Sequence, residues 1–510
     1  MDQVGARWRT VGTMLLLVVF GKGLAFLREA FVASQLGASA SSDGYYLALA
    51  LPTLVYSLGA LPFSMWVTAR LATLRDPNTG DNSAAFYSRM LGLVIGIGAI
   101  LAGALVVGAK TFVHFYAPGL DPERLNQTGT LTQISALAIP ALGAQAICNG
   151  RLFSDGRFVV VYAWLVISSV VGLGVVIGFA PQYGAAAAVA AFVAAAWASI
   201  VGPLILTRPR LWTKHPSPSV VWEEDLRYNV VYRALVMQLF FQGSIMLVYG
   251  FGSMLPPGEV AAALFGNKVQ NALYEIVAVT AGVLVYPQIA RLIQARDAQG
   301  VKSTIMNSLE WLLPLTAGLV VLLIVCRTEI VALIYERKRF DARAVDLVSA
   351  ALFGYAPGVV GLTLVEILHR TMVLRGRLKG YLVLFSAALG CNLLACLILV
   401  PTIGVAGLTF ASSLGVLVAS GGFIWYAARR LESFDSKEAI LLVTRTTFAA
   451  VFTLLVLTPV HHLMQGNSSL WHQVLTVGGV GLATACLLTG VLLALGHRWR
   501  TGVPMNARAA

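Results

Sequence analysis

The stretch GKGLAFLREAFVASQLGASASSDGYYLALALP, residues 21–52, places charged residues within and between apolar runs. It begins inside an apolar run, yet it carries Lys22, Arg28 and Glu29 before that run ends. A short link rich in glycine and serine then leads through Asp43 into a second apolar run. Charged side chains at membrane depth cost several kcal/mol unless they face a partner or a watery cavity. We therefore expect these charges to face one or the other.

The composition is that of a membrane protein. Of the 510 residues 58% are hydrophobic and 12% are charged, and the mean hydropathy is +0.78. In soluble domains roughly a quarter of the residues are charged. Apolar stretches of about 20 residues, each long enough to cross a bilayer as a helix, recur from end to end. The sequence therefore predicts an all-α, polytopic membrane protein.

We predict fourteen transmembrane helices from these stretches. Their approximate ranges are 11–33, 45–70, 90–113, 130–153, 158–179, 184–206, 230–251, 260–290, 310–334, 347–373, 380–401, 404–428, 440–462 and 471–496. The second, eighth and tenth are long enough to tilt, bend or extend beyond the bilayer.

The distribution of basic residues predicts the orientation. Lysines and arginines gather at the N-terminus and after every second predicted span, and the opposite loops contain few. The exceptions are Lys110 with Arg124, and the mixed stretch 335–346. This bias places both termini in the cytoplasm. It also accounts for most of the net charge of +13, so no nucleic-acid partner is needed.

An internal repeat accompanies the helix count. Three residues recur 220 positions later at the same points of that count, as Gly156/Gly376, Pro181/Pro401 and Gly184/Gly404. A duplicated six-helix unit with the substrate between its copies is a common transporter plan. The predicted parts are a six-helix bundle at 1–207, a cytoplasmic linker at 208–229, a second six-helix bundle at 230–430, and two further helices with a tail at 431–510.

Both predicted halves carry charges at membrane depth. Lys22 and Glu29 are seven residues apart and share one helical face, with Arg28 on an adjacent face. In the second half, Lys268 is followed seven residues later by Glu275. These residues favour a shared cationic cavity for an anion such as a diphosphate. In the alternative, Arg28 and Glu29 reach to the outer interface and Lys22 pairs with Glu29.

Polar residues near the outer ends of the second and eighth spans extend this candidate site. They are Asp43, Tyr45, Tyr46, Tyr56 and Asn267. We place Asp43 at an outer gate or in an ion pair with Lys22, Arg28 or Lys268. We place Tyr56 among the substrate-binding residues.

Other intramembrane polar residues suggest coupling or packing. Glu366 is a candidate for binding a coupling ion or proton, or for pairing with a lysine or with His369. Glu29 and Glu275 are further candidates for coupling or gating. Gln238 and Gln242, four residues apart, are more typical of hydrogen bonds between helices. No nucleotide-binding motif occurs, so we expect no cofactor and a drive from the membrane potential, Na⁺ or H⁺.

An enzyme has little support. His461, His462 and His472 lie near the outer ends of the last two spans, but no acidic pair accompanies them in the sequence. The five cysteines lie in apolar segments without metal-site spacing, and we interpret them as packing residues. They are Cys148, Cys326, Cys391, Cys396 and Cys486. We expect no metal site.

The opening stretch resembles the MurJ/MviN family of lipid II flippases, in the multidrug/oligosaccharidyl-lipid/polysaccharide exporter superfamily. The residues that carry the resemblance are 26–30, 32–33, 36–38, 43–48 and 51–52, with support from 117–120, 335–340 and 404–408. It implies two six-helix bundles around a cationic cavity, plus two C-terminal helices that form a groove for a polyprenyl tail. It also implies that Arg28 matches a functional arginine and Asp43 a functional aspartate.

The chain departs from the family pattern at several positions. Lys22 and Lys268 stand where the family usually has arginine, Tyr56 replaces another arginine, and Leu61-Pro62 replaces an acidic–glycine pair. Lysine keeps the charge but loses the planar fork that binds phosphate with two hydrogen bonds. The cargo is therefore lipid II or the repeat unit of an exopolysaccharide or O-antigen.

We predict a monomeric flippase of the bacterial inner membrane. It carries an undecaprenyl-diphosphate-linked saccharide from the cytoplasmic to the periplasmic leaflet by alternating access. Its partners are this lipid, the surrounding membrane lipids and glycan-synthesis enzymes. One alternative is a drug or cation antiporter of the same superfamily, which predicts an acidic cavity. Another is a membrane glycan polymerase or ligase, which predicts a large outer loop. A scaffold for synthesis enzymes would not explain charges at membrane depth.

Overall fold

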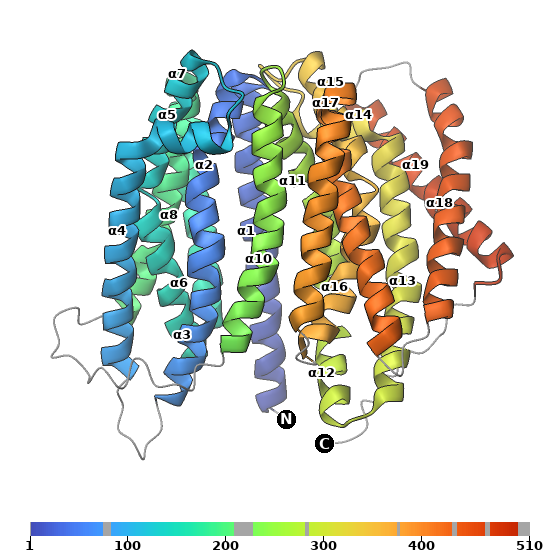
Figure 1. Ribbon diagram of the computed structural model, residues 1–510, viewed down its shortest axis with the longest axis horizontal. Coiled ribbons are helices and arrows are strands. Elements are labelled where there is room, and N and C mark those ends of the chain that lie inside the picture. Colours follow the sequence, from blue (N-terminus) through green and yellow to red (C-terminus); the bar gives the residue numbers. More distant parts are fainter. Residues whose placement is uncertain are drawn as a thin grey trace. The chain divides into compact units, whose positions relative to one another are not determined.

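The computed structural model describes residues 2–74, 83–208, 228–280, 285–374, 378–430, 436–464 and 470–497. These residues form helices joined by short turns, which confirms the predicted all-α class (Figure 1). The chain divides into two compact units, of which unit 1 comprises Met1–Ala261 and Arg337–Asp341. Unit 2 comprises Ala262–Glu336 and Ala342–Ala510. The predicted linker at 208–229 falls inside unit 1 and lies largely outside the described residues, so the predicted domain limits stay a prediction.

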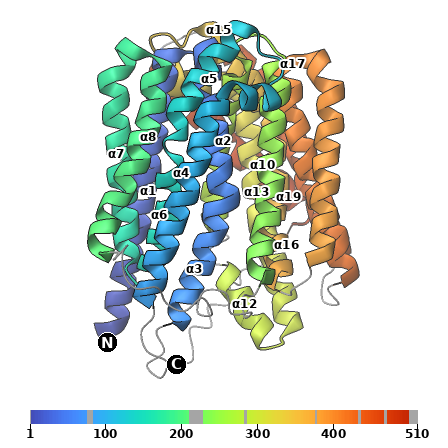
Figure 2. The same cartoon turned by 60° about the vertical axis from the view of Figure 1, so that its left-hand side comes forward.

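Unit 1 consists of α-helices and one π-helical turn. They are α1 (Asp2–Leu36), α2 (Ala40–Val55), the π turn η1 (Tyr56–Ala60), α3 (Leu61–Thr73), α4 (Ser83–Tyr116), α5 (Pro122–Ala136), α6 (Ile139–Ser154), α7 (Phe158–Tyr183), α8 (Ala185–Thr207) and α10 (Tyr228–Ser253). In this unit α1 packs against α7, which in turn packs against α8 (Figure 2).

Unit 2 begins within α11, whose first turn belongs to unit 1. Its helices are α11 (Glu259–Thr280), α12 (Tyr286–Gln294), α13 (Ala298–Val325), α14 (Arg327–Tyr335), α15 (Ala342–Tyr355), α16 (Gly358–Leu374), α17 (Leu378–Arg430), α18 (Ser436–Met464) and α19 (Leu470–Ala494). The two C-terminal helices α18 and α19 pack against each other and against α13.

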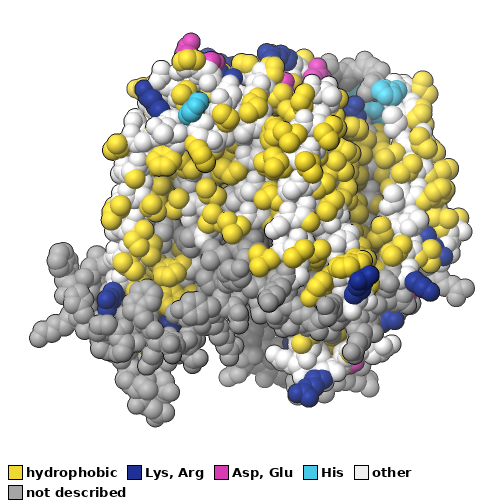
Figure 3. All heavy atoms as spheres, in the orientation of Figure 1, with side chains coloured by type: hydrophobic (Ala, Val, Ile, Leu, Met, Phe, Trp, Pro, Cys, Tyr) yellow, Lys and Arg dark blue, Asp and Glu magenta, His cyan; other side chains and the backbone are white. Residues whose placement is uncertain are grey.

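The helix surfaces fit a bilayer. Among the described residues, eight helices are long and apolar enough to cross a membrane, or nine if the bent pair α15–α16 counts as one span. Apolar side chains cover much of the described surface (Figure 3). The most exposed include Val107 and Phe115 on α4 and Leu463 on α18. Such surfaces are stable in lipid, where helices satisfy their own backbone hydrogen bonds. The multi-pass class is therefore confirmed, and the count of fourteen spans stays a prediction.

The internal repeat has a counterpart in the backbone. Gly184, between α7 and α8, has φ 55° and ψ −127°. Gly404, within the kink of α17, has φ 55° and ψ −134°. Residues with a Cβ atom rarely adopt this conformation, so glycine is required at both turns. The same unusual turn, three residues after Pro181 and Pro401, supports a duplicated unit.

Two predicted spans depart from a regular α-helix. In the span predicted at 45–70, Pro52 lies near the end of α2 and the π turn Tyr56–Ala60 follows. In the span predicted at 347–373, α15 and α16 meet at an angle of 44°. Proline lacks the backbone N–H, and π turns and kinks are common where the ladder is interrupted. The first of these spans therefore changes to π-helical geometry within its length, and the second bends.

Candidate functional site

Arg28 and Glu29 of the opening stretch form an ion pair within the helix packing of unit 1. Glu29 of α1 is buried, with 4% of its surface exposed. Arg28 Nη2 donates to Glu29 Oε1 at 3.0 Å, and the Tyr46 hydroxyl of α2 donates to Oε2 at 3.0 Å. The Tyr45 hydroxyl lies 3.5 Å from Oε1. Each buried carboxylate oxygen thus has a donor, as a buried charge requires.

The ion pair with Glu29 uses one terminal nitrogen, Nη2, of the Arg28 guanidinium. The Arg28 side chain is 17% exposed, and its stem packs near Gly172 of α7, where an added Cβ would lie 3.4 Å from Arg28 Cδ. Among the described residues, its buried Nε has no hydrogen-bond partner. The planar fork can bind an oxyanion with two parallel hydrogen bonds. Glu29 therefore orients an arginine that keeps unused donors.

The predicted lysines belong to different units. Lys22 is exposed on α1 of unit 1. Lys268 and Glu275 are half-buried on the part of α11 that belongs to unit 2. Each of the two lysines thus lies on a helix. The cationic cavity shared by both halves stays a prediction.

Asp43, in the first turn of α2, connects this helix to α5 and to the start of α11. Its side chain is 1% exposed and accepts hydrogen bonds from the backbone N–H groups of Gly258 at 2.7 Å and Ala261 at 2.8 Å. Arg124 Nη2 of α5 donates to the same carboxylate at 3.1 Å. The first backbone N–H groups of a helix carry partial positive charge and favour an anion. Its ionic partner is therefore Arg124 and not one of the three predicted cations, and the outer-gate role stays a prediction.

A loop from later in the chain joins the opening stretch. Residues Arg337–Asp341, between α14 and α15, belong to unit 1. The Arg339 backbone N–H donates to the Ser34 carbonyl at 3.1 Å, and Lys338 Nζ lies 5.4 Å from the centre of the Phe31 ring. Gly37 has φ 64°, and an added Cβ would meet the Arg339 carbonyl. The glycine is thus needed both for its conformation and for this close approach.

Tyr56 lies in an apolar setting. It begins the π turn, is half-buried and lines a cavity of about 240 Å³ with Pro52, Val55 and Phe63. The other walls are apolar residues of α4 and α6, and the two side chains of Leu61-Pro62 lie outside the described set. This setting fits an apolar part of a ligand better than a diphosphate, and the binding role of Tyr56 stays a prediction.

The remaining polar candidates lie on single helices. Glu366 is half-buried on α16, and the side chain of His369 lies outside the described residues. Gln238 and Gln242 are half-buried on α10. These positions suit interhelical contacts, and a coupling role for Glu366 stays a prediction.

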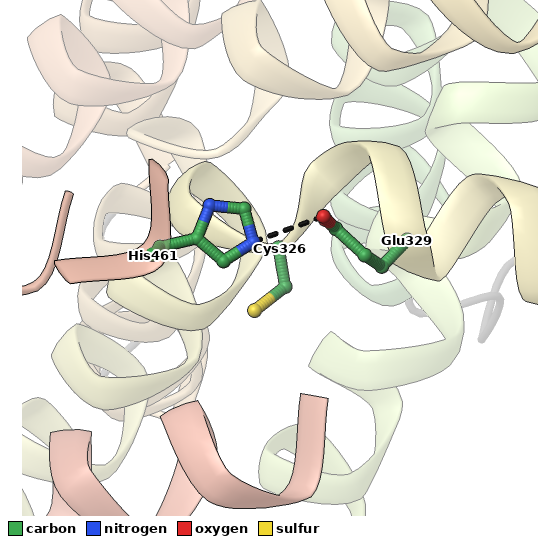
Figure 4. Close-up of side chains that lie close together, drawn as sticks. All are labelled: Cys326, Glu329 and His461. Atoms are coloured by element: carbon green, nitrogen blue, oxygen red, sulfur yellow. Dashed lines mark ion pairs between the residues drawn. The ribbon is translucent and has the colours of Figure 1, made fainter. Parts of the chain in front are cut away.

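The histidines near the outer ends of the last spans do have an acidic neighbour. His461 Nε2 of α18 lies 2.9 Å from Glu329 Oε1 of α14, and Cys326 lies beside them (Figure 4). We expected no acidic pair beside these histidines, and the structure places one acid, Glu329, beside His461. The sequence could not show this because 132 residues separate the two side chains.

Helical units with a repeated turn, apolar outer surfaces and an oriented, partly buried arginine are typical of a multi-pass membrane transporter. The model of the lipid II flippase MurJ family matches residues 32–477. The chain therefore belongs to the MurJ lipid II flippase family.

Known proteins agree with this assignment. The lipid II flippase MurJ of Burkholderia cenocepacia is 24% identical over 419 residues, which cover 78% of this chain and 79% of that protein. A probable lipid II flippase MurJ of Rhizobium tropici is 21% identical over 452 residues, or 84% of this chain and 83% of the relative.

Solved structures show the same fold. A lipid II flippase MurJ in an inward closed conformation has a TM-score of 0.78 at 15% identity, covering 95% of this chain and 99% of that one. An inward-facing multidrug resistance transporter of the MATE family has a TM-score of 0.65 at 14% identity, covering 82% of this chain and 98% of that one. Family membership makes the protein a flippase for a lipid-linked saccharide and not an enzyme.

Proposed function

We propose that this protein moves lipid II, an undecaprenyl-diphosphate-linked saccharide, from the cytoplasmic to the periplasmic leaflet by alternating access. The observation that carries the site assignment is the Arg28–Glu29 pair, in which Glu29 orients an arginine with unused donors. A diphosphate needs such donors, because charge-assisted hydrogen bonds are about twice as strong as neutral ones. The names of the family and its relatives support lipid II as the cargo.

Three cations would share the work of binding. Arg28 binds the diphosphate through its planar fork, and Lys22 and Lys268 supply further positive charge. Glu29 keeps Arg28 in position while the site is empty of substrate, and the aromatic hydroxyls of α2 keep Glu29 in position. The apolar cavity at Tyr56 and the C-terminal helices α18 and α19 suit the hydrocarbon part of the substrate.

The membrane potential can drive this movement. The diphosphate is an anion, and a bacterial cell is negative inside, so export of the head group runs down the potential. The gain is about 2.3 kcal/mol per charge per 100 mV. A coupling ion, Na⁺ or H⁺, bound at Glu366 is the second means of drive, and neither needs a cofactor.

The cargo can be tested by depletion in the native host. Lipid-linked precursors are extracted as the protein disappears, and undecaprenyl-diphosphate-linked species are quantified by mass spectrometry. We expect lipid II to accumulate first, with its head group on the cytoplasmic leaflet. Accumulation of a polysaccharide repeat unit, with normal amounts of lipid II, would contradict the lipid II assignment.

We further propose that the chain acts as a monomer with both termini in the cytoplasm. The bias of basic residues supports the orientation. Reporter fusions at each terminus test the orientation, and the mass of the protein in lipid nanodiscs tests the monomer. A periplasmic terminus or a stable dimer would contradict these two proposals separately.

A further inference from the structure

Three side chains with metal-binding chemistry meet in unit 2. Cys326 joins the end of α13 to the start of α14, Glu329 lies in the first turn of α14, and His461 lies in the last turn of α18. Their ligand atoms, one from each residue, all lie within 4.8 Å of one another. Figure 4 shows the imidazole nitrogen facing the carboxylate with the thiol beside them.

The arrangement is more than an ion pair between two helices. Cys326 is fully buried, His461 is 4% exposed, and the Glu329 side chain is 14% exposed. His461 Nε2 and Glu329 Oε1 lie 2.9 Å apart but lack the alignment of a hydrogen bond, and Glu329 Oε2 is buried with no hydrogen-bond partner among the described residues. Buried polar atoms without a partner are rare in native proteins. A bound ligand between these groups would therefore give His461 Nε2 and Glu329 Oε2 the partner that they lack among the described residues.

The donor set decides which partner would fit. Thiolate sulfur, imidazole nitrogen and carboxylate oxygen together are typical ligands of Zn²⁺, whereas Mg²⁺ and Ca²⁺ prefer oxygen alone. A tetrahedral Zn²⁺ holds such atoms about 3.4–3.6 Å apart. The Glu329–His461 contact would open by roughly half an ångström, and the farthest pair would close by about 1.2 Å or less. Small side-chain rotations achieve both shifts.

We propose that Cys326 Sγ, Glu329 and His461 Nε2 form a Zn²⁺ site that fastens α18 to the α13–α14 junction. Water occupies the fourth position, as in zinc sites with three protein ligands. Binding displaces the proton of the Cys326 thiol, which leaves to solvent, and the thiolate and the carboxylate together neutralise the cation. The site ties a C-terminal helix to the body of unit 2, against which α18 already packs along α13.

The test uses the full-length protein in nanodiscs, stripped of metal by a chelator. Zn²⁺ is titrated in competition with a chromophoric chelator, for the wild type and for Cys326→Ser, Glu329→Gln and His461→Ala. We expect one Zn²⁺ per chain, with affinity at least tenfold lower in each variant, because even outer-shell changes at zinc sites cost about 10–100-fold. Co²⁺ in place of Zn²⁺ should give a thiolate charge-transfer band that Cys326→Ser removes.

Two residues of the same types serve as matched controls. His462 is the exposed neighbour of His461, and Cys486 is exposed on α19. His462→Ala and Cys486→Ser should bind Zn²⁺ within twofold of the wild type. Binding that is no tighter in the wild type than in a chain carrying all three of these substitutions would overturn the proposal. An equal loss of affinity in His462→Ala would overturn it as well.

A second measurement does not depend on any variant folding. Amide hydrogen exchange of the last two turns of α18 is compared in wild-type protein with Zn²⁺, with Mg²⁺ and with neither. Zn²⁺ should slow this exchange several-fold and Mg²⁺ should leave it unchanged, since the donor set suits the softer ion. Equal exchange in all three conditions would contradict the fastening role.

Discussion

Glu29 and Asp43 are two buried acids, fourteen residues apart, that are satisfied in different ways. Glu29 accepts hydrogen bonds from side chains, namely Arg28 and the hydroxyls of Tyr45 and Tyr46. Asp43 is bound by two backbone N–H groups at the start of α11 and by Arg124. Side chains can exchange partners by rotation, whereas backbone donors move only with their helix. The comparison indicates that Glu29 serves an adjustable site and Asp43 a fixed joint.

The largest effect is expected at the adjustable site. Arg28→Ala should abolish complementation of a depletion strain, because it removes the fork that would bind the diphosphate. Membrane levels of the variant should equal those of the wild type, since Arg28 is partly exposed. Growth after depletion, with immunoblots of membranes, measures both.

Two variants control this experiment. Arg28→Lys keeps the charge without the fork and should complement in part. Lys110→Ala removes an exposed cation from α4 and should complement fully. Full complementation by Arg28→Ala at native expression would contradict the proposed role of Arg28 in binding the diphosphate.

At the fixed joint the expected effect is on stability. Asp43→Ala leaves two backbone N–H groups and Arg124 without their acceptor. We expect a loss of about 3–5 kcal/mol, as when one partner of a buried ion pair is removed. Reversible unfolding in mixed detergent micelles measures it, with the exposed Glu123→Ala within about 0.5 kcal/mol as control. A change at Asp43 as small as that of the control would show that the joint is not fixed.

Arg124→Ala should cost less than Asp43→Ala. The carboxylate keeps both backbone donors and loses one hydrogen bond to a charged group, worth about 1.5–3 kcal/mol. The same unfolding assay measures the difference, and transport should remain once the protein is folded. Arg124→Ala as damaging as Asp43→Ala would mean that the ion pair, and not the helix start, holds Asp43.

The smallest effect separates the two acids by function. Glu29→Gln keeps the shape of the side chain and removes the charge that orients Arg28. Flipping should fall by about tenfold, the equivalent of one charge-assisted hydrogen bond, while stability changes little. Tyr46→Phe leaves the Arg28 contact and should reduce flipping by less. Loss of stability without loss of transport in Glu29→Gln would make Glu29 a second joint.

Hydropathy and charge predicted the class of fold because a spanning segment in lipid has little choice but to be a helix. The same cost argument predicted that Arg28 and Glu29 would face a partner or a watery cavity, and Arg28 forms an ion pair with Glu29, the next residue in the chain. The partner of Asp43 was missed, although Arg124 had a signal: it is a basic residue among loops that otherwise contain few. The Cys326 cluster gave no signal, because chain order does not tell which helix ends meet.

The π turn at Tyr56–Ala60 has a consequence for the helix that follows it. A π turn contains one residue more than an α turn, and each residue of an α-helix advances the side chains by about 100°. The side chains of α3 are therefore rotated by about that angle from where an unbroken continuation of α2 would place them. Deleting one residue from the turn would bring the two segments into phase and direct a different stripe of α3 toward α6, its neighbour in unit 1.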